Sequence, residues 1–174
     1  MRFSNRLTKL LGTAAAIMML GGAAGAVQAA SIEGTWRTLN GTEISVDRCG
    51  DGYCGLLSWI VIPKEQSGMC KSMAKEAFAS LMLDYNNADQ SLQSRPLLGV
   101  EMLKLKPTKD DDAYTASIYN AEDGKTYDVL VWVMGGDTLR LGGGCLGSMC
   151  AVTQDWPRVP ERPATPDFTC DGGA

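Results

Sequence analysis

The six cysteines are the residues of this sequence best suited to covalent chemistry, and their spacing indicates disulfides. Cys49/Cys54 and Cys145/Cys150 share the spacing CxxxxC, and glycines inside both loops allow each pair to close locally. That pairing leaves Cys70 and Cys170 for one long-range bond. A tetrathiolate zinc site built from the two CxxxxC pairs is the alternative. A CxxC redox motif is absent from the sequence.

Histidine is absent from all 174 residues, and this excludes several kinds of active site. Serine triads, Cys-His dyads and the usual zinc-hydrolase sites all need an imidazole. The run Asp110-Asp111-Asp112 is acidic enough to attract a divalent cation, but adjacent carboxylates point in different directions, so we interpret it as a solvated turn. We therefore expect a protein that is not an enzyme and holds neither a cofactor nor a metal ion.

Residues 1–29 have the composition of a cleavable secretory signal. Three basic residues precede an uncharged run over residues 10–26, and Val27-Gln28-Ala29 offers small residues for cleavage after Ala29. An uncleaved membrane anchor is the alternative, but the apolar run is short and contains three glycines. We predict a periplasmic protein without stable membrane insertion after cleavage, in a compartment that favours disulfides.

Cleavage of the signal makes the chain distinctly acidic. The signal carries three of the 16 basic residues and none of the 20 acidic ones, so the mature chain keeps 13 basic residues and a net charge of −7. This charge argues against nucleic acid and against anionic membrane surfaces as partners. The oligomeric state does not follow from the composition.

Residues 30–158 predict one all-β domain, because short runs of alternating polarity recur with turn residues between them. Turns are indicated by Asn120–Gly124 and by Gly135-Gly136. We expect an antiparallel up-and-down β-barrel of about eight strands. The strand candidates are 43–47, 114–118 and 138–141, which alternate, and 54–62, 97–105 and 129–134, which are apolar on both faces.

Two segments lie outside this strand pattern. Residues 69–82 place methionines and other apolar residues at helical spacing, which predicts one amphipathic helix after the third strand, packed across the barrel mouth or wall. The methionine-rich face of this helix suits the core, with a ligand or membrane contact as the alternative. Residues 159–174 predict an extended proline-rich tail, held only by the disulfide of Cys170.

The two ends of the predicted barrel carry a matched pair of side chains. Gly34-Thr35-Trp36 opens the first strand, and Trp156 and Arg158 lie at the end of the last strand. In an antiparallel barrel the guanidinium of Arg158 can lie over the indole of Trp36 and close one end. We interpret Trp36, Trp156 and Arg158 as structural residues.

The same residues belong to a longer pattern. In order, it comprises Gly34-Thr35-Trp36, Cys49-Gly50 with Cys54-Gly55, Asp84, Asn87, Arg95-Pro96-Leu97 with Gly99, Ile118-Tyr119, Asp123–Tyr127, Gln154, Trp156 and Arg158. This pattern resembles the bacterial exported family known as domain of unknown function 2147. The resemblance implies a periplasmic lipocalin-like or calycin-like barrel with no established activity.

The chain departs from the family pattern at two places. The segment Cys70–Phe78 and the tail after Arg158 look like additions, and each carries one of the two remaining cysteines, which strengthens the pairing of Cys70 with Cys170. The family's usual Trp-Thr-Arg ending is Trp156-Pro157-Arg158 here. Proline removes a backbone donor, so we expect the last strand to end early.

The resemblance also singles out polar residues that are candidates for a binding site at the barrel mouth. They are Asp84, Arg95, Tyr119, Lys125 and Tyr127. Arg95, Tyr119 and Tyr127 are the ligand-binding candidates among them, and Trp59, which is not part of the pattern, is the fourth candidate. Hydrogen bonds that fix loops are the alternative role for these groups. We expect a non-catalytic protein that binds a small apolar or amphipathic molecule. An envelope structural or protein-interaction module, with the helix or the tail as its contact surface, is the second hypothesis.

Overall fold

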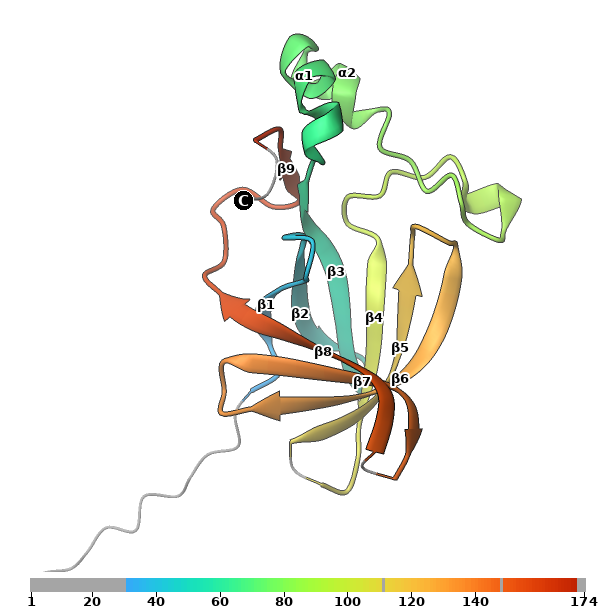
Figure 1. Ribbon diagram of the computed structural model, residues 1–174, viewed down its shortest axis with the longest axis vertical. Coiled ribbons are helices and arrows are strands. Elements are labelled where there is room, and N and C mark those ends of the chain that lie inside the picture. The colour runs from blue at the N-terminus through green and yellow to red at the C-terminus, as the bar shows by residue number, and fades with distance from the viewer. Residues whose placement is uncertain (1–30, 111, 148, 172–174) are drawn as a thin grey trace, which may run out of the picture.

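The protein is a closed barrel of eight antiparallel strands with a small helical extension at one end (Figure 1). The computed structural model describes residues 31–110, 112–147 and 149–171, so the predicted signal, residues 1–29, lies outside the described residues. The barrel strands are β1 (Gly34–Arg37), β2 (Glu43–Cys49), β3 (Gly52–Val61), β4 (Glu101–Pro107), β5 (Ala113–Asn120), β6 (Lys125–Met134), β7 (Thr138–Leu146) and β8 (Met149–Val159). The predicted all-β barrel is confirmed.

Each strand pairs with its neighbours in sequence, and β1 closes the ring by pairing with both β2 and β8. The predicted turns connect two of the hairpins, and Gly124, Gly135 and Gly136 all have positive φ angles. The β1–β8 contact is short, since its register covers only Thr35 with Val159 and Trp36 with Arg158. The remainder of β8 pairs with β7 alone.

Alternate side chains of the strands fill the barrel with one apolar core. In β4, Leu103 and Leu105 are buried, while Lys104 between them is exposed. The core cluster consists of Ile32, Trp36, Ile44, Val46, Leu57, Leu103, Leu105, Tyr114, Ala116, Val131, Val133, Leu139, Leu141 and Trp156. The inward positions of the wall are therefore occupied by large side chains.

Trp36 and Arg158 close one end of the barrel as the sequence predicts. The Arg158 guanidinium carbon lies 4.0 Å from the centroid of the Trp36 ring. Arg158 also donates to the carbonyls of Glu33 and Gly136, at 2.6 and 2.7 Å. The Trp36 indole N–H donates to the carbonyl of Ile32 at 2.9 Å. The guanidinium thus ties three segments of chain to one buried ring.

The structure has two short helices where the sequence predicts one. α1 (Lys64–Ser72) and α2 (Lys75–Ala79) are separated by Met73 and Ala74, whose backbone is extended. Met69 is exposed, whereas its neighbour Cys70 is buried and bonded to Cys170. Both helices lie beyond the end of β3 rather than across the barrel mouth (Figure 1). Their buried side chains form a second cluster with Ile62 and Phe168.

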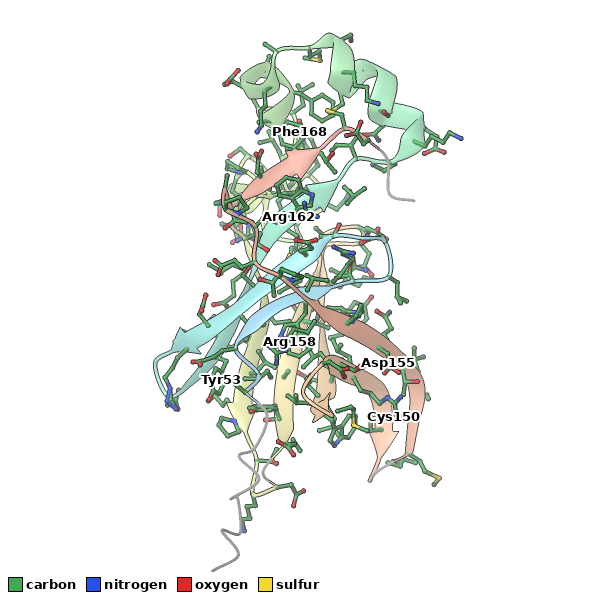
Figure 2. All side chains as sticks on the ribbon, turned by 90° about the vertical axis from the view of Figure 1, so that its left-hand side faces the viewer. Tyr53, Cys150, Asp155, Arg158, Arg162 and Phe168 are labelled. Atoms are coloured by element: carbon green, nitrogen blue, oxygen red, sulfur yellow. A yellow bond between two sulfur atoms is a disulfide. The ribbon has the colours of Figure 1, made fainter. Side chains whose placement is uncertain are left out.

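The C-terminal tail is held by more than its disulfide. The short strand β9 (Asp167–Thr169) pairs in parallel with β3. Arg162 forms an ion pair with Glu43 at 2.9 Å, and Phe168 is buried near the helices (Figure 2). The tail is therefore a strap that joins the barrel wall to the helical extension.

β8 continues through Pro157 instead of ending before it. The N–H of Arg158 donates to the carbonyl of Asp137, on the β7 side, at 2.7 Å. Successive N–H groups of a strand point to opposite sides, so the nitrogen of Pro157 faces away from β7. The pairing with β1 begins only at Arg158, so no donor is needed at residue 157.

All six cysteines form disulfides in the pairing expected from the sequence. Cys49 bonds to Cys54, Cys145 to Cys150 and Cys70 to Cys170. Within the described residues, no helix has the length and apolar character needed to cross a membrane.

Candidate functional site

A buried carboxylate organises the loop between the helices and β4. Backbone hydrogen bonds from Asp84 to Arg95 and from Leu97 to Met82 close residues 84–95 into a loop. The Asp84 carboxylate is fully buried and accepts hydrogen bonds from the Tyr119 hydroxyl, from Asn87 at 2.8 Å and from Arg95 at 2.9 Å. One carboxylate thereby joins the loop to β5.

The network keeps Asp84 charged. Burial raises the pKa of the Asp84 carboxyl, but hydrogen bonds from Tyr119, Asn87 and Arg95 outweigh burial and leave the pKa below its ordinary value. Burial also raises the pKa of the Tyr119 hydroxyl, as does its hydrogen bond to Asp84. At neutral pH the site therefore pairs a neutral tyrosine with an ionised aspartate.

Acid is expected to weaken the fold through Asp84. A carboxyl whose pKa is lower in the folded chain stabilises it fully above the ordinary aspartate range, and that contribution is lost as pH falls through the lowered native pKa. We expect Asp84→Asn to lower the free energy of unfolding by about 1–3 kcal/mol at pH 7. Below about pH 5 the unfolding free energy of this variant should fall less steeply with pH than that of the wild type. Denaturant unfolding from pH 7 to pH 3 measures both effects. Asp128→Asn, at an exposed carboxylate, is the control; equal acid sensitivity in the Asp84 variant and wild type would contradict this role.

The loop is also fixed to the β5–β6 hairpin by backbone contacts. The Asn86 side-chain amide donates to the carbonyls of Ala121 and Glu122, at 3.2 and 3.0 Å. Gly124 faces the Asn86 carbonyl so closely that a Cβ on Gly124 would lie 1.7 Å from that oxygen, and its φ angle is +69°. Only glycine fits this position, which explains its place in the sequence pattern.

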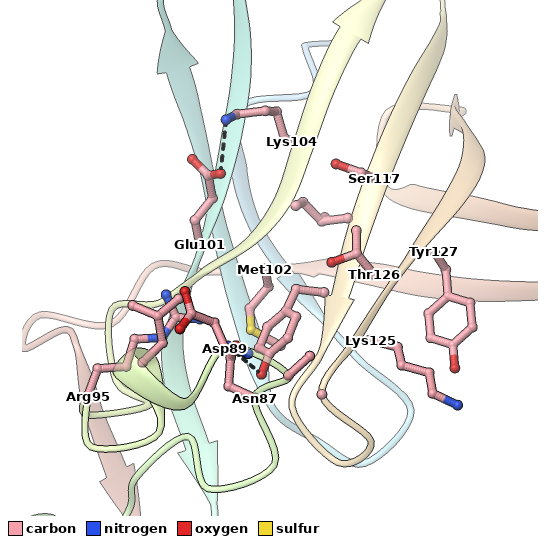
Figure 3. Close-up of a pocket in the computed structure, with 15 residues that line it drawn as sticks. Asn87, Asp89, Arg95, Glu101, Met102, Lys104, Ser117, Lys125, Thr126 and Tyr127 are labelled. Carbon is pink, nitrogen blue, oxygen red and sulfur yellow. Dashed lines mark hydrogen bonds and ion pairs between the residues drawn. The ribbon is translucent and has the colours of Figure 1, made fainter.

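A pocket of about 640 Å³ lies between this loop and the barrel wall (Figure 3). The loop provides one side, β4 and β5 provide the floor, and the start of β6 provides the other side. Its lining residues are Asn87, Ala88, Asp89, Leu92, Arg95, Glu101, Met102, Leu103, Lys104, Ser117, Tyr119, Gly124, Lys125, Thr126 and Tyr127. The volume falls within the range of small-molecule sites.

The pocket is on the outer face of the wall, not at the barrel mouth expected from the sequence. Leu103 and Ala116 belong to the core, and side chains alternate along each strand. Lys104 and Ser117, which are opposite one another in the β4–β5 register, therefore point outward, as does Tyr119. The expectation fails because the core cluster occupies the inward positions and the loop covers the wall from outside.

The lining combines an apolar patch with polar groups of both charges. Leu92 and Met102 supply apolar surface, and Ser117 and Thr126 supply hydroxyls. Lys104 is paired with Glu101 at 3.4 Å, and Arg95 is paired with Asp84 at 2.8 Å. Among the described residues, the ion pairs do not include Lys125. Lys125 shares a face of β6 with Tyr127, opposite to Thr126, so its ammonium is directed away from the apolar patch (Figure 3). Lys104 points outward into the pocket, and its ion pair with Glu101 joins two exposed side chains.

Three of the four ligand-binding candidates line this pocket, and one lies elsewhere. Arg95 and Tyr119 border it through the Asp84 network, while Tyr127 is at the rim with its ring directed away from Asn87 (Figure 3). The Tyr127 hydroxyl donates to Asp123, and this hydrogen bond raises the pKa of Tyr127. Tyr119 pairs with Thr126 in the β5–β6 register, whereas Tyr127 is the next residue along β6 and pairs with Ile118. Because successive side chains of a strand alternate, Tyr119 and Tyr127 point to opposite faces of the sheet.

Trp59 is part of a different cluster, on β3. Arg162 of the tail lies over the Trp59 ring, with its guanidinium carbon 4.1 Å from the ring centroid, and binds the buried Glu43. Burial raises the pKa of the Glu43 carboxyl, but hydrogen bonds from Arg162 and Arg37 bring it below its ordinary value. Trp59 therefore anchors the tail in this structure and takes no part in the pocket.

Sequence reasoning missed the lining residues that come from β4 and from the start of β6. Lys104, Ser117 and Thr126 are ordinary polar residues on the wet face of predicted strands, and nothing in their type marks a site. The strand register is the signal that identifies them, because it aligns Lys104 with Ser117 and Tyr119 with Thr126. In the part of the chain that the structure describes, no group of three acidic, cysteine or histidine side chains is placed to hold a metal ion.

Comparison with known proteins supports the fold. The sequence matches the family described as "Uncharacterized protein conserved in bacteria (DUF2147)" over residues 34–158. Among solved structures, the chain is similar to protein HP1028 from the human pathogen Helicobacter pylori, which is described as belonging to the lipocalin family. The two share 22% identity with a TM-score of 0.52, over 75% of this chain and 84% of the other. No curated protein sequence gives a significant match.

Proposed function

The chain belongs to the bacterial family DUF2147, and we propose that it is a non-catalytic periplasmic protein that binds a small amphipathic molecule with an anionic group. The periplasmic location is proposed from the signal-like residues 1–29, and three disulfides suit that compartment. The binding function is proposed from the pocket on the outer wall.

The observation that carries this proposal is the juxtaposition of Lys104 with the apolar side chain of Met102, two residues away on the same outward face of β4, in a preformed pocket. The Asp84 network and the Asn86 contacts fix the loop before any ligand arrives, so little ordering cost remains for binding. Leu92 and Met102 would contact an apolar portion of the ligand. Lys104 would attract a carboxylate or sulfonate, since its ion pair with Glu101 is exposed and therefore weak. The hydroxyls of Ser117 and Thr126 supply further hydrogen-bonding groups.

Titration with matched probes tests the proposal. We expect the mature protein to bind the anionic dye 1-anilinonaphthalene-8-sulfonate and decanoate, as measured by fluorescence and calorimetry. Lys104→Gln should weaken binding of both anions about fivefold or more, because one charge pair near the surface is lost. Binding of decanol, which has the same chain without a charge, should change little.

Lys109→Gln is the matched control, since Lys109 is an exposed lysine outside the pocket lining. It makes the same change in net charge and should leave all affinities at the wild-type value. Failure of the folded protein to bind either anion, or equal affinities in the Lys104 and Lys109 variants, would overturn the proposed site.

A further inference from the structure

The β7–β8 hairpin carries the longest uncharged run of the chain after residue 30. Residues 141–154 contain no acidic or basic side chain, although the mature chain has a net charge of −7. Arg140 and Asp155, at the two ends of this run, form an ion pair at 2.7 Å. The hairpin is thus the place where two acidic molecules can approach with the least repulsion.

The outer edge of β8 is unpaired over most of its length. β8 pairs with β7 along residues 149–157, whereas its pairing with β1 includes only Arg158 and Val159. For residues 149–155 the other edge has no strand partner in the described part of the chain. We call these residues the free edge of β8. Such an edge presents backbone N–H and C=O groups that can accept another strand.

Large apolar side chains are exposed beside this edge. Leu146 is 83% exposed, Met149 76% and Val152 62%, and these are three of the four most exposed large hydrophobic residues described. The Cys145–Cys150 disulfide crosses the hairpin next to them. Apolar surface and backbone groups without a strand partner therefore occur together on a cross-linked hairpin.

This combination favours a strand over a membrane as the occupant. Hydrocarbon cannot hydrogen-bond the backbone groups of the free edge, so insertion into lipid would leave them unsatisfied. A second strand satisfies them and covers Val152 at the same time. A second copy of this chain presents an identical edge with no charge between residues 149 and 154.

We propose that the protein forms a two-fold symmetric dimer by antiparallel pairing of the free edges of two β8 strands. Centred on Val152, this pairing places Val152 opposite Val152 of the other copy and Met149 opposite Asp155. No like charges face each other across the two-fold axis, and the central contact is a pair of β-branched side chains. The proposal is independent of the wall pocket, which lies on β4–β6.

A charge exchange at the two-fold axis tests this dimer. We expect the mature wild-type protein to show a concentration-dependent dimer in sedimentation equilibrium, with slower amide hydrogen exchange at residues 149–155 as the concentration rises. Val152→Asp and Val152→Lys each place like charges opposite one another, so each should raise the dimer dissociation constant at least about tenfold. An equimolar mixture of the two variants should recover dimers, because aspartate then faces lysine.

Leu39→Asp is the matched control. Leu39 is 72% exposed on the β1–β2 turn, so its replacement makes the same charge change away from β8 and should leave dimerisation unchanged. Circular dichroism and melting curves check that every variant folds. A wild type that remains monomeric up to about 1 mM, or Val152 variants that dimerise like wild type, would overturn the proposal. A monomer that co-sediments with phosphatidylcholine vesicles would instead assign the exposed side chains to a membrane contact.

Discussion

Replacement of Trp36 by alanine is expected to lower the free energy of unfolding by about 3–5 kcal/mol, the range for loss of a buried aromatic side chain. Trp36 has no solvent exposure, and its ring lies between the core and the Arg158 guanidinium. Its removal leaves a cavity at the barrel closure and strands the Ile32 carbonyl that the indole N–H satisfies. Denaturant unfolding at pH 7 measures the loss.

A double-mutant cycle separates closure from burial alone. If Arg158 and Trp36 stabilise the barrel together, the double variant should lose less unfolding free energy than the sum of the losses in Trp36→Ala and Arg158→Ala. The difference, which is the coupling energy, should be about 0.5–2 kcal/mol. Trp132→Ala, which removes the same side chain at a half-buried position, should cost less than Trp36→Ala. An unchanged melting temperature of the Trp36 variant would refute its role in closing the barrel.

The barrel itself could be predicted because its information is local. Alternation along β4 and β5 and the glycines of the two hairpin turns each follow from neighbouring residues. The contact of Trp36 with Arg158 joins opposite ends of the barrel, yet it too could be predicted, since an antiparallel ring must bring its first and last strands together.

The helical extension and the tail could not be predicted in the same way. The apolar spacing of residues 69–82 fits one helix, but the backbone is extended at Met73, and Cys70 and Phe78 pack against distant residues of the tail. Similarly, nothing beside Arg162 in the sequence indicates that its partners are Glu43 and Trp59. Such contacts depend on three-dimensional placement rather than on local pattern.

The wall pocket shows the same division between local and distant information. Asp84, Arg95 and Tyr119 could be selected from the sequence pattern, because their roles in fixing a loop require particular side chains. The face on which they lie could not, since it depends on the core filling the inward positions of the wall. A site assigned to the barrel mouth therefore lies outside it.

The Cys70–Cys170 disulfide is expected to make the largest single covalent contribution to stability. It spans a sequence separation of 100 residues that contains β4 to β8. In the chain-entropy model, a loop of this length stabilises the fold by about 4–5 kcal/mol, whereas the short Cys145–Cys150 loop gives only about 2 kcal/mol. We expect the free energy of unfolding of the Cys70→Ala/Cys170→Ala variant to be lower by about 4–5 kcal/mol, measured in buffer without added reductant or oxidant.

The Cys145→Ala/Cys150→Ala variant is the internal control, because it removes the same two sulfur atoms from a local loop. Equal losses in the two variants would contradict the dependence on loop length. Limited digestion with a glutamate-specific protease shows where the loss is located. Without the Cys170 anchor, β9 is held by only three paired residues and by contacts such as Lys75 with Asp167. Cleavage after the exposed Glu161 should therefore accelerate before the barrel unfolds. If cleavage and global unfolding stay coupled, the strap and the barrel form one cooperative unit, and the full entropic loss should appear in the barrel's own unfolding transition.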